Sequence, residues 1–172
     1  MNNMINDNKK NTQLIINHIQ SLQKQIEQMN QNMKQLNINN LSNQEIKYDD
    51  IRYVGQVVNR LKEGKGTLYY NNGNIYQGYF ENDKAEGKGI IYYNDGDIYE
   101  GDFKNGKFEG KGIYYYNNGF RYEGDLSNDK REGKGIFYYN NGDREMGYYH
   151  DNMPKGKFVM LTSSGEIKIN NY

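Results

Sequence analysis

The sequence predicts an all-β repeat fold, an elongated single-layer antiparallel β-meander that follows an N-terminal α-helix or coiled-coil segment. Three observations lead to this prediction: a 23-residue repeat from residue 53 onward, the confinement of every glycine to that part of the chain, and a heptad-like apolar pattern before it. A repeat of this length is typical of solenoids, in which each unit buries its apolar face only against its neighbours.

The first 52 residues divide into three predicted segments. Residues 1–11 are polar and are predicted to be disordered. Residues 12–38 are predicted to form a helix. Residues 39–52 are predicted to be a linker, in which Ser42 and Glu45 are spaced to cap one short helical turn.

Apolar residues of the predicted helix alternate at steps of four and three, which is the heptad pattern of a coiled coil. They are Ile15, Ile19, Leu22, Ile26, Met29, Met33 and Leu36. Two interpretations stay open: this seam pairs with a second copy or with another protein, or it packs on the chain's own sheet. The narrow spacing favours homo- or hetero-oligomer formation through residues 12–36, because a helix that covers a flat sheet needs a broader apolar stripe.

Five repeat units are expected, followed by a cap at residues 168–172. Each unit is predicted to be a β-hairpin plus a linking turn. In the third unit, strands at 98–103 and 110–116 are joined by a loop at 104–109, and an Asn-Asn-Gly turn follows. The units cover residues 53–75, 76–98, 99–121, 122–144 and 145–167.

Side-chain alternation along the strands predicts an aromatic face. Its rings are expected to lie over glycines of neighbouring strands, because a side chain at these glycines would lift the aromatic layer off the sheet. The structural glycines are Gly78, Gly89, Gly101, Gly112, Gly124 and Gly135. The residues predicted to form a partner-binding groove on this face are Tyr76, Phe80, Tyr93, Tyr99, Phe103, Tyr116, Tyr122 and Tyr139.

The opposite face is unusually apolar. Ile90, Ile113 and Ile136 recur at the fifteenth place of the unit, and tyrosines such as Tyr69 and Tyr138 recur at the seventeenth. Two interpretations stay open for these residues: cross-strand pairing that stiffens a thin sheet, or a second docking surface.

The third unit resembles the MORN repeat, whose pattern is YxGx(W/F)xxGxxxGxG followed by a turn glycine. The matching residues are Tyr99, Gly101, Phe103, Gly106, Gly110, Gly112 and Gly119. The resemblance extends over residues 53–167 and implies a slightly curved single-sheet solenoid with an aromatic groove. Proteins similar to it act as scaffolds at membranes, in the cytoskeleton and in ciliary axonemes.

Departures from the pattern are local. Arg60, Asp83 and Asp129 stand where the pattern has its loop glycine. The fifth unit begins with Glu145 in place of tyrosine and carries Phe158 in place of a glycine. Degenerate end units are expected of caps, so the residues from 145 onward are predicted to close the sheet.

No catalytic or metal-binding constellation is predicted, and no cofactor is expected. The chain has no cysteine and only two histidines, His18 and His150. The acids Glu100 and Asp102 lie on an open strand without the desolvated cleft that separates two pKa values for acid/base catalysis. The protein is therefore predicted not to be an enzyme.

The charge balance limits the partners. Lys plus Arg equal Asp plus Glu at 22 each, which disfavours binding to nucleic acid. The predicted function is a scaffold or adaptor that binds an extended or helical segment of a protein partner. The alternative is a membrane-surface tether that recognises phosphoinositides, which the charge balance disfavours. The absence of cysteine, of a membrane span and of a signal sequence predicts a cytoplasmic protein, and the resemblance implies a cytoskeletal or ciliary (axonemal) assembly.

Overall fold

The computed structural model describes residues 17, 20–29, 31, 43–48 and 51–172, which belong to two units, Met1–Leu41 and Ser42–Tyr172. In the first unit, residues 20–29 form an α-helix on which Leu22, Ile26 and Met29 are 44%, 57% and 62% exposed. The other predicted seam residues, Ile15, Ile19, Met33 and Leu36, and the predicted tail at residues 1–11 lie outside the described residues. No helix in the described ranges is long and apolar enough to cross a membrane.

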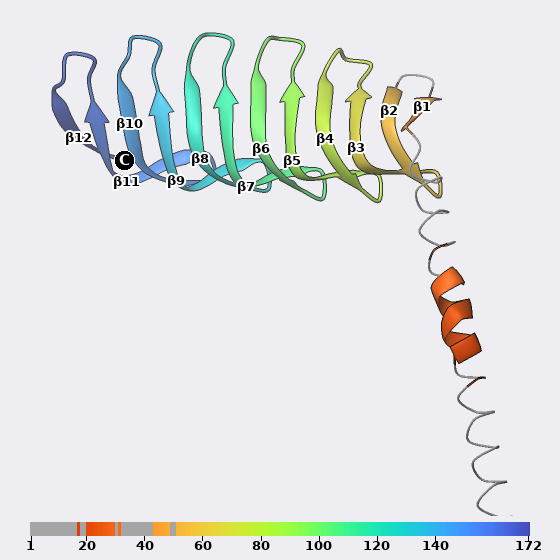
Figure 1. The fold of residues 1–172 in the computed structure, drawn as a ribbon. Helices are drawn as coiled ribbons and strands as arrows, with labels where there is room; N and C mark the ends of the chain where they lie inside the picture. The colour runs from red at the N-terminus through yellow and green to blue at the C-terminus, as the bar shows by residue number, and fades with distance from the viewer. Residues whose placement is uncertain (1–16, 18–19, 30, 32–42, 49–50) are drawn as a thin grey trace, which may run out of the picture. The chain divides into compact units, whose positions relative to one another are not determined.

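The second unit is one antiparallel sheet whose twelve strands follow chain order (Figure 1). The predicted single-layer meander is therefore confirmed. The strands are β1 (Asn43–Tyr48), β2 (Ile51–Val58), β3 (Leu61–Tyr69), β4 (Ile75–Glu81), β5 (Lys84–Tyr92), β6 (Ile98–Lys104), β7 (Lys107–Tyr115), β8 (Arg121–Ser127), β9 (Lys130–Tyr138), β10 (Arg144–His150), β11 (Met153–Leu161) and β12 (Ile167–Asn171).

Strand β1 corrects the prediction for the segment before the repeats. Residues Asn43–Tyr48 pair with β2 along their whole length, from Asn43 opposite Gln56 to Tyr48 opposite Ile51. The predicted helical turn at Ser42 and Glu45 is therefore wrong. The edge of β2 offers backbone hydrogen bonds to a neighbouring strand, and this pairing outweighs a local capping motif.

The hairpin turn inside each unit is shorter than predicted. In the third unit only Asn105 and Gly106 connect β6 to β7, with φ angles of 52° and 82°. Positive φ at both central residues is the requirement of a tight two-residue hairpin turn. The predicted loop at 104–109 is therefore wrong, because β7 already begins at Lys107.

A β-bulge lies where that loop was expected. Gly101 pairs with Gly112 and Phe103 with Phe108, so β7 uses four residues where β6 uses two. Gly110, inside this bulge, has a φ of 70°. Equivalent register shifts occur in each of the five hairpins β2–β3, β4–β5, β6–β7, β8–β9 and β10–β11. Bulges bend the strands and increase their twist, so each hairpin is curved at the equivalent position along its strands.

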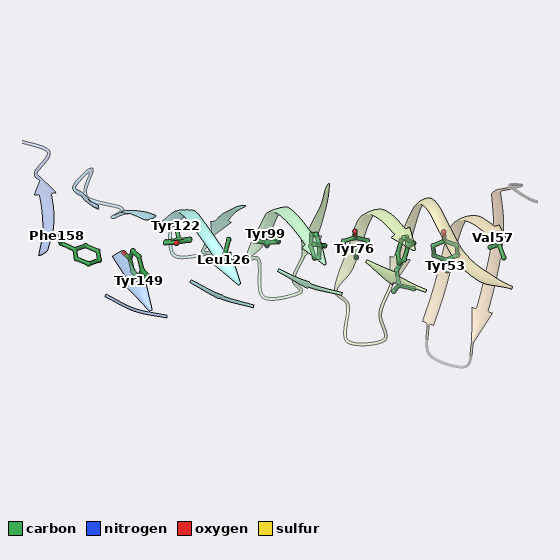
Figure 2. Packing of buried hydrophobic residues seen from close by; sticks show 11 residues of the cluster. Tyr53, Val57, Tyr76, Tyr99, Tyr122, Leu126, Tyr149 and Phe158 are labelled. Atoms are coloured by element: carbon green, nitrogen blue, oxygen red, sulfur yellow. The ribbon is translucent and has the colours of Figure 1, made fainter. Parts of the chain in front are cut away.

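The core is a row of aromatic side chains along one face of the sheet. Figure 2 shows Tyr53, Tyr76, Tyr99 and Tyr122 following one another from unit to unit. A second ring or an aliphatic residue from the same strand fills the gap between successive tyrosines. Phe80, for example, packs edge-on against both Tyr53 and Tyr76, with ring centroids 5.1 Å away in each case. The buried core is therefore continuous from one repeat unit to the next.

Candidate functional site

The tyrosine at the start of each unit is fixed between two glycines. The Tyr99 side chain is 0% exposed, and its hydroxyl donates a hydrogen bond to the carbonyl oxygen of Asp102 at 3.0 Å. A Cβ atom added at Gly101 or at Gly112 would meet the Tyr99 ring. Tyr53, Tyr76 and Tyr122 make the same hydrogen bond and lie over the equivalent glycine pairs. All six glycines singled out from the sequence lie beneath these rings.

The fifth unit restores this packing with exchanged residues. The Phe158 ring lies where a Cβ atom of Gly147 would be, so the phenylalanine that replaces a glycine supplies the missing ring. Glu145, which replaces the tyrosine, is only 4% exposed. Its carboxylate accepts hydrogen bonds from the hydroxyls of Tyr172 at 2.9 Å and Tyr139 at 3.0 Å, and from the Asn170 amide at 2.7 Å. These contacts join β12 and the C-terminal residue to the core.

The predicted aromatic groove divides into two sets of residues. Five of its members belong to the buried core, namely Tyr76, Phe80, Tyr99, Phe103 and Tyr122. The other three, Tyr93, Tyr116 and Tyr139, are half-buried. Burial, followed by nearby carboxylates such as Asp129, raises the pKa of Tyr93 to about 12. A partner-binding role for this face stays a prediction, and only the half-buried set offers it much surface.

A long groove lies on the opposite face and crosses strands β4 to β10, with a volume of about 1070 Å³. Its floor is glycine backbone, because a Cβ atom at these glycines would point toward the tyrosines of the other face. We call it the isoleucine groove. It is lined by Ile90, Ile113, Ile136, Met146, Gln77 and Tyr148, by Lys88, Lys111, Lys134, Glu100 and Glu123, and by Gly89, Gly101, Gly112, Gly124, Gly135 and Gly147.

Cross-strand pairing arranges one row of the groove in a fixed order. The neighbours from β4 to β10 are Gln77, Ile90, Glu100, Ile113, Glu123, Ile136 and Met146. Isoleucine and glutamate therefore alternate from strand to strand. At the β9–β10 end of the row, the two adjacent residues, Ile136 and Met146, are both apolar.

The lysines of the groove form a second row, and most of their charge is compensated. Lys88 forms an ion pair with Asp102 at 2.7 Å, and Lys111 pairs with Asp125. The Lys134 ammonium lies 5.7 Å from the centroid of the Tyr148 ring. In the first row, by contrast, Glu100 has no ion pair with any residue that the structure describes, and Glu123 has only a long one with Arg121 at 3.8 Å. The two glutamates and the Lys134 ammonium are therefore the charges of the groove that lack a close ion pair among the described residues.

The tyrosines at the seventeenth place lie outside the isoleucine groove. The Arg52 guanidinium is 3.8 Å from the centroid of Tyr69, and that of Arg121 is 3.9 Å from Tyr138. Arg52 pairs with Tyr69 and Arg121 with Tyr138 across adjacent strands. Cross-strand pairing, one of the two interpretations from the sequence, describes Tyr69 and Tyr138, whereas the isoleucines line a groove.

The recurring acids at the turns serve to join the units. Asp83, in the hairpin turn of unit two, accepts a hydrogen bond from the Lys62 N–H at 2.8 Å. Partial burial opposes ionisation of this carboxyl, but the Lys62 hydrogen bonds and charge lower its pKa overall. Asp129 and Asn152 make the same contact with Phe108 and Arg131.

No metal centre is found among the residues that the structure describes, since none of their His, Cys, Asp and Glu side chains form a group of three or more placed to hold an ion. His150 lies on β10, where its Nδ1 is 2.9 Å from the Glu132 carboxylate, and His18 lies outside the described residues.

Comparison with known proteins agrees with the repeat. The MORN repeat family model matches at four tandem positions, residues 53–75, 76–98, 99–121 and 122–144. The fifth predicted unit, residues 145–167, is not matched, although it forms the same hairpin. Its exchanged tyrosine and glycine account for the difference in pattern. A search of curated proteins found no match.

Among solved structures, the chain is similar to the SAS-4 (dCPAP) TCP domain of Drosophila melanogaster, solved in complex with a proline-rich motif of Ana2 (dSTIL). The identity is 15%, the match covers 74% of this chain and 70% of that one, and the TM-score is 0.51. The TCP10c domain of Drosophila melanogaster Sas-4 matches with 18% identity, coverage of 75% and 98%, and a TM-score of 0.37. The first likeness concerns the fold alone.

Proposed function

We propose that this chain, which belongs to the MORN-repeat family, is a non-enzymatic scaffold or adaptor that binds a segment of a protein partner in the isoleucine groove. The observation that carries the proposal is the groove itself. It crosses seven strands, and its row of isoleucines ends in Met146. Grooves lined by apolar side chains with a few charged groups are typical of binding sites.

The open face explains why a macromolecular segment fits better than a small molecule. A small-molecule site encloses most of its ligand, whereas this groove runs along a sheet with nothing above it among the described residues. Each unit contributes the same backbone floor, so the binding surface grows with the number of units. The SAS-4 TCP domain, a sheet of similar fold, is itself in complex with a proline-rich motif of Ana2.

The proposed site differs from the aromatic groove predicted from the sequence. The core tyrosines are buried within the chain, so little of their surface is available to a partner. They contribute to binding mainly because they fix the glycine backbone that forms the floor of the isoleucine groove. Tyr93, Tyr116 and Tyr139 stay a secondary candidate surface. The proposal is therefore tested on both faces separately.

The test compares matched variants in binding experiments. Ile113→Lys places a charge at the centre of the isoleucine groove, and Met153→Lys places the same charge on an exposed apolar residue outside it. Proximity labelling in cells should yield a set of proteins that is lost with Ile113→Lys and kept with Met153→Lys. Recovered proteins should then bind the purified chain directly. If Tyr116→Lys abolishes binding while Ile113→Lys does not, the wrong face has been chosen.

The membrane alternative is tested alongside. Phosphoinositide headgroups require available cationic side chains, and two of the three groove lysines are already paired with Asp102 and Asp125. The purified chain should therefore not sediment with phosphoinositide-containing vesicles at low salt more than with neutral ones. Preferential sedimentation would favour the membrane tether. The family analogy extends our proposal to a cytoskeletal or ciliary (axonemal) assembly, which fluorescent tagging in cells would test.

A further inference from the structure

We infer that the isoleucine groove takes an amphipathic α-helix of another protein, laid across the strands with one heptad per repeat unit, whose basic residues meet Glu100 and Glu123. This inference rests on the proposed function and adds the conformation and the charge pattern of the bound segment. It follows from the spacing of the groove side chains, from the shape of the groove and from its charges.

The spacing of the groove matches the spacing of a helix face. Adjacent strands lie about 4.8 Å apart, so Ile90, Ile113 and Ile136, which alternate with glutamates strand by strand, recur about every 9.6 Å. A helix rises about 10.5 Å per seven residues, and about 4.5–6 Å per three or four. Every seventh residue of a helix that crosses the strands therefore meets an isoleucine, and the residue three or four places further meets a glutamate.

The shape of the groove admits a helix that lies across the strands. Six strand steps give the groove a length of about 29 Å. A helix of that length with side chains is a cylinder about 10–12 Å wide, with a volume of about 2300–3300 Å³. The groove volume of about 1070 Å³ therefore receives roughly a third to a half of such a helix. This fraction is compatible with a helix that lays one face in the groove.

The composition of the groove disfavours a proline-rich segment, which is the main alternative to a helix. Three residues of a polyproline helix rise about 9.3 Å, so spacing alone would also admit a proline-rich segment. Grooves that bind such segments are lined by aromatic rings, into which the proline rings pack. Here the lining is isoleucine, methionine and glycine backbone, and the single ring, Tyr148, lies at one end.

The charges define the polar positions of the partner. Glu100 and Glu123 interrupt the apolar row and lack a close cationic partner in the described part of the chain, whereas two of the three lysines in the second row are paired. Covering these carboxylates with apolar groups would leave them desolvated and unpaired, which is costly. The partner helix should therefore carry Lys or Arg opposite them, and two apolar residues opposite Ile136 and Met146.

These requirements disfavour the chain's own heptad helix as the segment that binds in the isoleucine groove. Leu22, Ile26 and Met29 are apolar at successive steps of four and three. Such a seam would place an apolar residue against each glutamate. The expected partner motif instead has apolar residues at positions 1, 8, 15 and 18 and basic residues at positions 4 and 11 when the helix begins over Ile90. When the helix runs the other way and begins over Met146, the apolar positions are 1, 4, 11 and 18 and the basic positions are 8 and 15.

The experiment selects helical peptides on the immobilised full-length protein. The probe is a displayed library of 21-residue peptides with a helix-favouring background and random residues at those six positions. We expect one of two patterns to be enriched: apolar residues at positions 1, 8, 15 and 18 with Lys or Arg at 4 and 11, or, for the reversed helix, apolar residues at 1, 4, 11 and 18 with Lys or Arg at 8 and 15. Synthetic peptides with the enriched sequence are then measured by fluorescence anisotropy against variants of the protein.

Charge reversal provides the decisive comparison. Glu100→Lys with Glu123→Lys should weaken binding of the basic peptide by about tenfold per glutamate and shift selection toward Asp and Glu. Glu81→Lys with Glu166→Lys makes the same change of net charge outside the groove and should leave both results unchanged. Circular dichroism of each variant, compared with that of the wild type, verifies that the sheet is folded.

The other outcomes separate the inference from the proposed function. Enrichment of proline-rich peptides, an unchanged basic preference in the groove variant, or tighter binding of a peptide with the sequence of residues 12–38 would overturn the helix inference. In those cases loss of binding with Ile113→Lys would still support the groove as a site. Peptides that bind Ile113→Lys as well as the wild type would overturn both.

Discussion

A tyrosine ring that lies over two glycines on adjacent strands is the residue-scale unit of this fold. The ring needs both glycines, because its hydroxyl and one edge lie in the space that their Cβ atoms would fill. The hydroxyl then satisfies a carbonyl group of its own strand, as Tyr99 does for Asp102. Each ring is thus fixed by packing and by one hydrogen bond, and it stabilises two strands together.

Gly101→Ala should destabilise the protein strongly for this reason. The new Cβ atom would lie 2.7 Å from both the Gly112 Cα and the Lys111 carbonyl oxygen, and it would also meet the Tyr99 ring. Backbone atoms cannot move away without breaking the pairing of β6 with β7, so we expect a loss of about 3 kcal/mol or more in the free energy of unfolding. Urea denaturation measures the loss. The Asp102→Ala variant, on the opposite side of the strand, should lose less, and an equal loss would contradict the assigned facing.

Gly106→Asp should have the opposite effect. Gly106 has a φ of 82°, and the equivalent turn residues Asp83 and Asp129 adopt positive φ angles of 68° and 66°. Each of those carboxylates accepts a hydrogen bond from an N–H of the preceding unit. The Ala85 N–H occupies the equivalent position in the preceding unit and would donate a hydrogen bond to an aspartate at position 106. We therefore expect the free energy of unfolding to rise by about 0.5–1 kcal/mol.

The control for this gain is Gly110→Asp. Gly110 also has a positive φ, of 70°, but a Cβ atom there would lie 3.0 Å from the Asp102 carboxylate. This substitution should lower the midpoint of thermal unfolding, whereas Gly106→Asp should raise it. A lower midpoint of thermal unfolding for Gly106→Asp would show that the turn acids do not join the units as described.

The hairpins show which features can be predicted from the sequence at the scale of an element. Strand type and order follow from the repeated alternation and from the turn glycines, because each unit carries the same local signals. The bulge does not follow, since Gly110 has the same signature in a loop as in a bulge. Only the pairing of Phe103 with Phe108 distinguishes the two. Strand β1 was missed because it depends on the edge of β2 and not on its own sequence.

The helix at residues 20–29 carries a prediction of its own. Leu22, Ile26 and Met29 form an exposed apolar stripe, which favours association with a second helix. We expect the full chain to be a dimer and Ile26→Asp to be a monomer with an unchanged sheet, because a carboxylate in the seam is not compensated. Light scattering measures the mass, and circular dichroism monitors the sheet.

The matched control is Gln20→Asp, which introduces the same charge away from the stripe. It should leave the dimer intact. A monomeric wild-type chain at high concentration would exclude homodimers through this helix and leave a partner helix as the alternative.

At the scale of the whole molecule, the site that we propose differs from the aromatic groove predicted from the sequence because register is a property of the assembled sheet. The sequence singles out Ile90, Ile113 and Ile136 by their period. Their alternation with Glu100 and Glu123 appears only when the strands are paired. The burial of Tyr76 and Tyr99 likewise depends on rings from neighbouring units, so periodicity alone could not separate core rings from surface rings.

The continuous row of buried tyrosines makes alkaline pH a test of the whole sheet. Burial, followed by the charges of Asp83 and Glu63, raises the pKa of Tyr53 to about 12, and burial raises the pKa of Tyr149 to about 12. Burial also raises the pKa values of Tyr76, Tyr99 and Tyr122. In the unfolded chain these hydroxyls ionise near pH 10. The unfolded state therefore binds fewer protons than the folded state above about pH 10, and stability must fall as the pH rises from there toward 12.

We expect the midpoint of urea unfolding to be unaffected by tyrosine ionisation below about pH 9 and to fall steeply between about pH 10 and 12, where the sheet should unfold in one transition. The part of the tyrosinate absorbance that exceeds the contribution of exposed tyrosines, such as Tyr79 and Tyr148, should rise together with the loss of sheet signal in circular dichroism, because the buried rings ionise only when the units separate. Tyr99→Phe, which removes one of these groups, should be less sensitive to alkali even if it is less stable at neutral pH. Ionisation of the buried tyrosines in a sheet that stays folded, seen as tyrosinate absorbance beyond that of the exposed tyrosines, would show that water reaches the rings, and the layer would then be an open surface instead of a core.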